Sequence, residues 1–188
     1  MKQILPILTL TTLTAAAFAD AGAAAPAAAA SGLNYNRVSI SRSGDSTGIE
    51  VSNLLNGSNV LLTIASNGEG FSTPSGNDGK QIAVFSVGYV FKNVAAGIDA
   101  TATLGGSTNG NQSGYAINLR RSLSEVVAGL EVALGYGHRK EDGSEASTYM
   151  SYELAYNINK QFSVAYGIVD PNGAGNSNIH IASLRYNY

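Results

Sequence analysis

Residues 80–105 read KQIAVFSVGYVFKNVAAGIDATATLG, and apolar and polar side chains alternate along both halves of this stretch. Lys80–Phe91 and Val94–Gly105 each have an apolar residue at almost every second position, which is typical of β-strands with one apolar face. Between them, Lys92-Asn93 is expected to form a two-residue hairpin turn. The pairs that this turn predicts across the hairpin are Phe91 with Val94, Tyr89 with Ala96, and Val87 with Ile98. Each pair joins two apolar residues, so the register keeps the two faces distinct.

The same alternation runs from Leu33 to Tyr188 and indicates an all-β fold. A turn at Asn56-Gly57 would set Val51 opposite Leu62 in a second hairpin. Clusters of Gly, Asn, Asp and Ser divide the chain into ten expected strands, with eight as the alternative. Besides the strands of these two hairpins, the expected segments are Leu33–Arg42, Tyr115–Arg121, Val126–His138, Thr148–Ile158, Phe162–Asp170 and Asn178–Tyr188. In the first segment Leu33 and Tyr35 are out of phase with Val38 and Ile40, which indicates a bulge.

The connections between these segments alternate in length. Short turns are expected at 56–57, 92–93, 122–124 and 159–161, and longer Ser-, Asn- and Gly-rich loops at 67–79, 105–114, 139–147 and 170–177. Only the first connection, 43–46, is short where a long loop is due. Short turns at one rim and long loops at the other predict an up-and-down antiparallel transmembrane β-barrel.

Alternation alone does not say which face meets water, because a soluble lipocalin-like barrel points its apolar face inward. Here the polar face consists mainly of small residues, whereas soluble exteriors carry many Lys and Glu side chains. Aromatic residues also gather near the strand ends, as at the two interfaces of an outer-membrane barrel. With the apolar face toward lipid, the expected charge network of the lumen consists of Arg37, Glu50, Asp99, Arg120, Glu131, Glu153 and Arg185.

These features resemble the small outer-membrane β-barrels of Gram-negative bacteria, of the opacity-protein and OmpA-type class. The chain ends on an alternating strand with Leu184, Tyr186 and Tyr188 on one face. In the class such a terminal aromatic strand is the signal read by the outer-membrane assembly machinery, so the resemblance gives these three residues that role. Typical members have eight strands, and this sequence departs from them in having ten expected strands.

The N-terminus reads as an export signal rather than as part of the barrel. Residues 1–19 combine Lys2, an apolar run and the small-x-small sequence Ala17-Phe18-Ala19, the pattern of a cleaved signal peptide. The apolar run is short for a membrane-spanning helix. Residues 20–32 are nearly all alanine and are expected to be a linker. The barrel domain is therefore expected over 33–188, in the outer membrane of a Gram-negative bacterium after export through the periplasm.

The predicted lumen is compatible with two classes of function. Narrow barrels fill with side chains, so paired lumen charges predict a plugged barrel with a structural or surface-exposed role. The alternative is a porin-like channel for ions or small solutes, in which the same charges select the permeating ion. A soluble lipocalin-like barrel that binds a ligand is the third and weakest hypothesis.

Composition and motifs exclude several other functions. The net charge of −2 gives no basic surface for nucleic acid, and the absence of cysteine excludes disulfides and thiolate metal sites. His138 and His180 fall on the apolar face, where a catalytic base facing the lumen would not lie. We therefore expect no enzymatic activity, no cofactor and no metal. The expected partners are outer-membrane lipid and the assembly machinery, with any partner of the loops unspecified.

Overall fold

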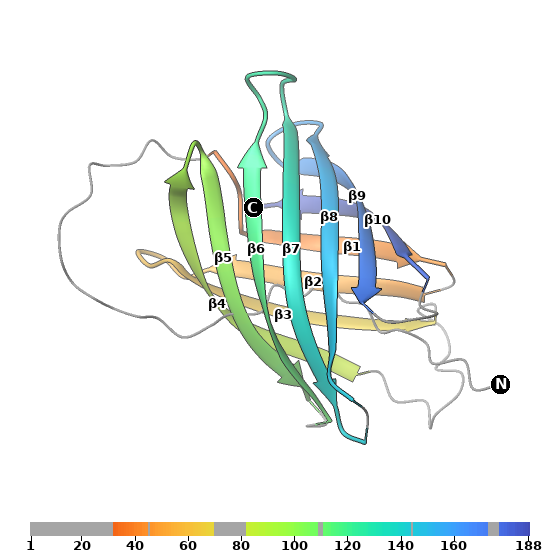
Figure 1. Ribbon diagram of the computed structural model, residues 1–188. Helices are drawn as coiled ribbons and strands as arrows, with labels where there is room; N and C mark the ends of the chain where they lie inside the picture. The colour runs from red at the N-terminus through yellow and green to blue at the C-terminus, as the bar shows by residue number, and fades with distance from the viewer. Residues whose placement is uncertain (1–31, 45, 70–81, 109–110, 144, 173–176) are drawn as a thin grey trace.

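The computed structural model describes residues 32–44, 46–69, 82–108, 111–143, 145–172 and 177–188, and these form one closed antiparallel β-barrel (Figure 1). Each strand pairs with its neighbours in the chain, and the first pairs with the last to close the ring. The ten strands are β1 (Arg37–Ser43), β2 (Ser46–Leu54), β3 (Val60–Glu69), β4 (Ile82–Ala95), β5 (Ile98–Ser107), β6 (Gln112–Ser122), β7 (Leu130–Glu141), β8 (Ser147–Asn157), β9 (Phe162–Asn172) and β10 (Ile179–Asn187). The all-β, up-and-down barrel with ten strands is confirmed. The predicted signal peptide, its cleavage site at Ala17 and Ala19, and all but the last residue of the predicted linker lie outside the described residues.

The alternation along each strand separates an apolar outer face from a polar inner face. In β4, Phe85 and Val87 are about half exposed, whereas Ser86 between them is buried. The same division holds around the barrel, with Leu, Ile, Val, Phe and Tyr outside and mostly Ser, Thr, Gly, Ala and charged residues inside. No helix long and apolar enough to cross a membrane occurs among the described residues, a finding that does not bear on crossing by strands.

The register predicted for the β4–β5 hairpin is wrong, although both faces are correct. β4 continues through Lys92-Asn93, and the chain reverses at Ala96-Gly97, where both residues have a positive φ. Phe91 therefore pairs with Ala100 instead of Val94, with an irregularity between Phe91 and Ala95. The shift is an even number of residues, so each side chain stays on its predicted side of the sheet.

The other turns at this rim also differ from the prediction. Asn56-Gly57 lies within a longer turn closed by a hydrogen bond from the Leu55 amide to the Val60 carbonyl, so Val51 pairs with Ile64 rather than Leu62. The turn expected at 122–124 extends over 123–129, and Val126 belongs to it rather than to a strand. At the opposite rim the strands continue into the Ser-, Asn- and Gly-rich stretches. Between β5 and β6, between β7 and β8, and between β9 and β10, fewer residues than predicted therefore separate the strands.

Inside the barrel, Gly137 of β7 makes room for a large ring. Gly137 pairs with Tyr149 of β8, and a Cβ atom added to Gly137 would overlap the Tyr149 ring. Gly137→Ala is expected to lower the free energy of unfolding by about 1–3 kcal/mol, because the ring must leave its place. Denaturant titration in detergent measures this loss. A Cβ on Gly167 meets only one atom at ordinary contact distance, so Gly167→Ala is the matched control. Equal stability of the two variants would contradict the packing described for Tyr149.

Candidate functional site: the charged lumen

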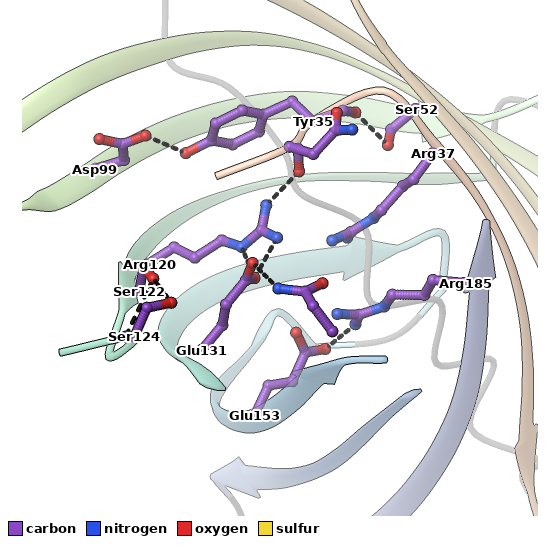
Figure 2. A network of polar contacts seen from close by, with 12 residues as sticks. Tyr35, Arg37, Ser52, Asp99, Arg120, Ser122, Ser124, Glu131, Glu153 and Arg185 are labelled. Carbon is purple, nitrogen blue, oxygen red and sulfur yellow. Dashed lines mark hydrogen bonds and ion pairs between the residues drawn. The ribbon is translucent and has the colours of Figure 1, made fainter. Parts of the chain in front are cut away.

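The structure places all seven sequence-predicted lumen residues on the inner face of the barrel wall, and Figure 2 shows Arg120 with Glu131 and Arg185 with Glu153. Asp99 is fully buried, and the others are buried or partly buried. They come from strands all around the barrel, namely β1, β2, β5, β6, β7, β8 and β10. Closure of the barrel is therefore what assembles the network.

Three ion pairs hold most of these charges along the wall. Arg37 of β1 lies 3.2 Å from Glu50 of β2, and Arg120 of β6 lies 2.5 Å from Glu131 of β7. Arg185 of β10 pairs with Glu153 of β8, across the intervening strand β9. Two of the three pairs join adjacent strands, because inward side chains on adjacent strands are already within reach of each other.

Tyr35 is the lumen residue that sequence reasoning missed. It precedes β1, yet its ring turns into the barrel and contacts Leu61 and Val90, while its hydroxyl donates to Asp99 Oδ2 at 2.9 Å (Figure 2). The Arg120 guanidinium carbon lies 5.2 Å from the ring centroid. Burial raises the pKa of Tyr35, so the phenol stays protonated and donates a hydrogen bond to the Asp99 carboxylate. The sequence did indicate this position, because Tyr35 is an even number of residues from Arg37 and Ser39, which face inward.

The carboxylates of the network have further hydrogen-bond donors. Glu131 Oε1 accepts from Asn157 Nδ2 at 2.7 Å, while its Oε2 accepts from Arg120. Asp99 Oδ1 accepts from the backbone amide of Asn93 at 2.8 Å, which ties the end of β4 to β5. These bonds satisfy buried charges that would otherwise destabilise the barrel.

A cavity of about 50 Å³ lies in the lumen beside the network. Tyr35, Arg37, Asn118, Arg120 and Glu153 are among the residues that line it. Several buried polar atoms of the lumen have no protein partner, and these atoms are Arg37 Nε, Ser39 Oγ, Asn118 Nδ2 and Arg185 Nε. Buried polar atoms without a protein partner are usually satisfied by water, and this cavity has room for a few water molecules. The geometry is that of a narrow, hydrated lumen.

The histidines lie outside this network, on the outer face. His138 stacks on Tyr115 at a centroid distance of 5.0 Å, and the Tyr166 hydroxyl lies 2.6 Å from His180 Nδ1. Within the described residues, no group of His, Cys, Asp and Glu side chains could hold a metal ion.

The C-terminal residues given a role in assembly also face outward. Leu184, Tyr186 and Tyr188 are each about half exposed. Tyr188 also contributes to closure of the barrel, since its amide donates to the Asn36 carbonyl at 3.1 Å and its hydroxyl to the Ser52 carbonyl at 3.2 Å.

No family model and no curated protein sequence matches this chain. Among solved structures it is similar to a KdgM porin in complex with disordered oligogalacturonate, with a TM-score of 0.53, 10% identity, and coverage of 81% of this chain and 98% of the porin. A second KdgM porin structure gives a TM-score of 0.47 at the same identity and coverage. OccAB2 of Acinetobacter baumannii gives 0.34 at 12% identity, covering 76% of this chain and 47% of that protein. The first of these shows that the chain has the fold of an outer-membrane β-barrel.

Proposed function

We propose that this protein is an integral outer-membrane β-barrel of a Gram-negative bacterium whose narrow lumen conducts ions and small polar solutes. The observation that carries this proposal is the lumen cavity, which is lined by arginine, carboxylate and amide side chains and has unpartnered polar atoms beside it. A polar, hydrated interior within an apolar outer face is the arrangement of a porin. The fold shared with a KdgM porin agrees with this arrangement.

The proposal includes the route to the membrane. The N-terminal signal would direct export through the periplasm, and Leu184, Tyr186 and Tyr188 would serve as the assembly signal. Their exposed, outward positions at the end of the chain, on or directly after the last strand, suit recognition by the assembly machinery and later contact with lipid. We propose neither a cofactor nor a catalytic activity.

We do not propose that this protein takes up the oligogalacturonate found in the KdgM complex. That porin is described with oligogalacturonate, an acidic oligosaccharide. Here each of the three lumen arginines Arg37, Arg120 and Arg185 pairs with a carboxylate. Their charges are therefore neutralised, and we expect no preference for polyanionic solutes.

Liposome swelling tests the channel proposal. Liposomes that contain the refolded protein are expected to admit salts and very small polar solutes such as glycerol, and to exclude disaccharides, because the lumen cavity is only about 50 Å³. Liposomes without protein provide the baseline. Swelling no faster than this baseline, from protein shown to be folded, would contradict the proposal.

Replacing Glu131 separates a conducting lumen from a plugged one. Glu131→Gln removes the negative charge that neutralises Arg120, so a channel is expected to shift its ion preference toward anions. The reversal potential in a salt gradient measures the shift. Glu125→Gln is the matched control, because Glu125 makes a similar ion pair with Arg121 on the exposed turn. An unchanged reversal potential in Glu131→Gln would mean that this pair does not border the conducting path.

The second candidate function is a structural or surface-exposed barrel of the opacity-protein and OmpA-type class. The observation that favours it is the occupied lumen, where the Arg37–Glu50 ion pair and the Tyr35 ring lie at the end of the barrel at which β1 begins and β10 ends. In that case Glu131→Gln would lower stability and no variant would conduct.

A further inference from the structure

Residues 33–36, called the plug segment below, run into the lumen before the chain enters β1. The segment forms no strand, so its position depends on individual contacts rather than on a ladder of sheet hydrogen bonds. Its best-buried side chain is Tyr35, which is 8% exposed and packs with Leu61 and Val90. Leu33 and Leu54 cover the same small apolar cluster.

The contacts of the plug segment reach both sides of the barrel. On the near side, Ser52 Oγ donates to the Tyr35 carbonyl at 2.8 Å, and Asn36 Oδ1 accepts from the Leu54 amide at 2.7 Å. On the far side, the Tyr35 hydroxyl reaches Asp99 of β5, and Arg120 Nη1 of β6 donates to the Asn34 carbonyl at 2.7 Å (Figure 2). β6 is the strand opposite β1 in the ring of ten. The segment therefore spans the lumen.

We propose that the plug segment is a tethered internal gate. Its contacts with Asp99 and Arg120, called the seat below, hold the lumen closed, and displacement of the segment from this seat opens the lumen. This inference rests on the proposed channel function. Arg120 takes part in both the gate and the ion pairs, because it bonds Asn34, lies over Tyr35 and pairs with Glu131. Seating the segment thus closes the lumen and completes the charge network at the same time.

Two substitutions of Tyr35 remove its contacts with the seat in two steps. Tyr35→Phe keeps the ring but removes its hydrogen bond to a charged acceptor, and is expected to raise the open-to-closed ratio about tenfold in planar-bilayer recordings. Tyr35→Ala removes the ring as well, and is expected to raise the ratio on the order of a hundredfold. Tyr152→Ala is the matched control, because Tyr152 lies on the outer face of β8. Heat-dependent gel mobility identifies the variants that fold.

A chemical measurement tests the seat without relying on conductance. The chain contains no cysteine, so a single Thr101→Cys gives one thiol at a position that is 3% exposed and lines the cavity beside Tyr35. In the Thr101→Cys background, Tyr35→Ala is expected to accelerate labelling by a small water-soluble thiol reagent on the order of a hundredfold, and Tyr152→Ala is not.

The two readouts distinguish the gate from the channel. Faster labelling together with longer openings supports the inference. Faster labelling with no conductance in any variant would show a seated segment in a barrel that is no channel, which overturns the proposed function and the gating role with it. Conductance and labelling that are both unchanged in Tyr35→Ala would overturn the gate while leaving the channel intact.

Discussion

Replacing Arg185 with methionine is expected to lower the free energy of unfolding by about 3–5 kcal/mol. Arg185 is 3% exposed, and its guanidinium pairs with Glu153, whose side chain is 9% exposed. Methionine fills a similar volume but leaves the carboxylate of Glu153 without its nearest positive charge, and an uncompensated buried charge is costly. Urea titration of the refolded protein in lipid vesicles measures the loss.

Two further variants serve as controls for Arg185→Met: a substitution of its partner Glu153 and a substitution of an exposed arginine. Adding Glu153→Met to Arg185→Met removes the uncompensated charge and is expected to recover most of the stability. Arg121→Met breaks the exposed pair with Glu125 and is expected to cost at most about 1 kcal/mol. If Arg185→Met were no more harmful than Arg121→Met, the lumen would be too well hydrated for its pairs to count as buried.

A lysine in place of Val87 is expected to block insertion of the barrel. Val87 is 48% exposed on the outer face near the middle of β4, where we place the core of the bilayer. A lysine at the midplane of an outer-membrane barrel costs about 2–4 kcal/mol, and the cost falls to about 0–1 kcal/mol near the interface. The measurement is the fraction of protein that acquires heat-resistant mobility in lipid vesicles.

Val94 provides the matched position for Val87. Val94 is also exposed on β4 but lies next to the Ala96-Gly97 turn at the rim. Val94→Lys is therefore expected to insert almost like the unchanged protein. If Val87→Lys instead dissolved and folded in buffer without detergent, the apolar face would not be a lipid-facing surface.

The sequence could predict which side chains face outward and which face inward, because this depends only on the alternation of side chains along a strand with a period of two residues. Phe85 and Val87 outside with Ser86 between them follow directly from the alternation. The register could not be predicted in the same way, since every even shift keeps the same faces. The β4–β5 turn at Ala96-Gly97 depends on two positive φ values, and a non-glycine residue such as Ala96 gives little sign of one in the sequence.

Several strands extend further into the Ser-, Asn- and Gly-rich stretches than the sequence predicts. Gly106 and Ser107 look like loop residues in the sequence, yet they belong to β5 and pair with its neighbours. In a closed barrel each strand has a partner on both sides, so weak strand formers can continue the ladder. Local composition does not contain this long-range contribution.

Parity could place the charged residues of the lumen but could not choose their partners. Arg185 pairs with Glu153 across β9, and Asp99 receives the hydroxyl of Tyr35. The second contact depends on the path of residues 33–36, which brings the Tyr35 ring into the barrel. The sequence predicts a bulge at Leu33 and Tyr35, although Tyr35 is two residues from the inward-facing Arg37 and therefore also fits an inward position.

Single-channel recording of the full chain, refolded in detergent and inserted into planar bilayers, tests directly whether the lumen conducts. We expect discrete conductance steps with brief openings, because the lumen is hydrated but the plug segment is in contact with Asp99 and Arg120. Silent bilayers, obtained with protein that shows heat-resistant mobility and β-rich circular dichroism, would contradict the channel and favour the structural barrel.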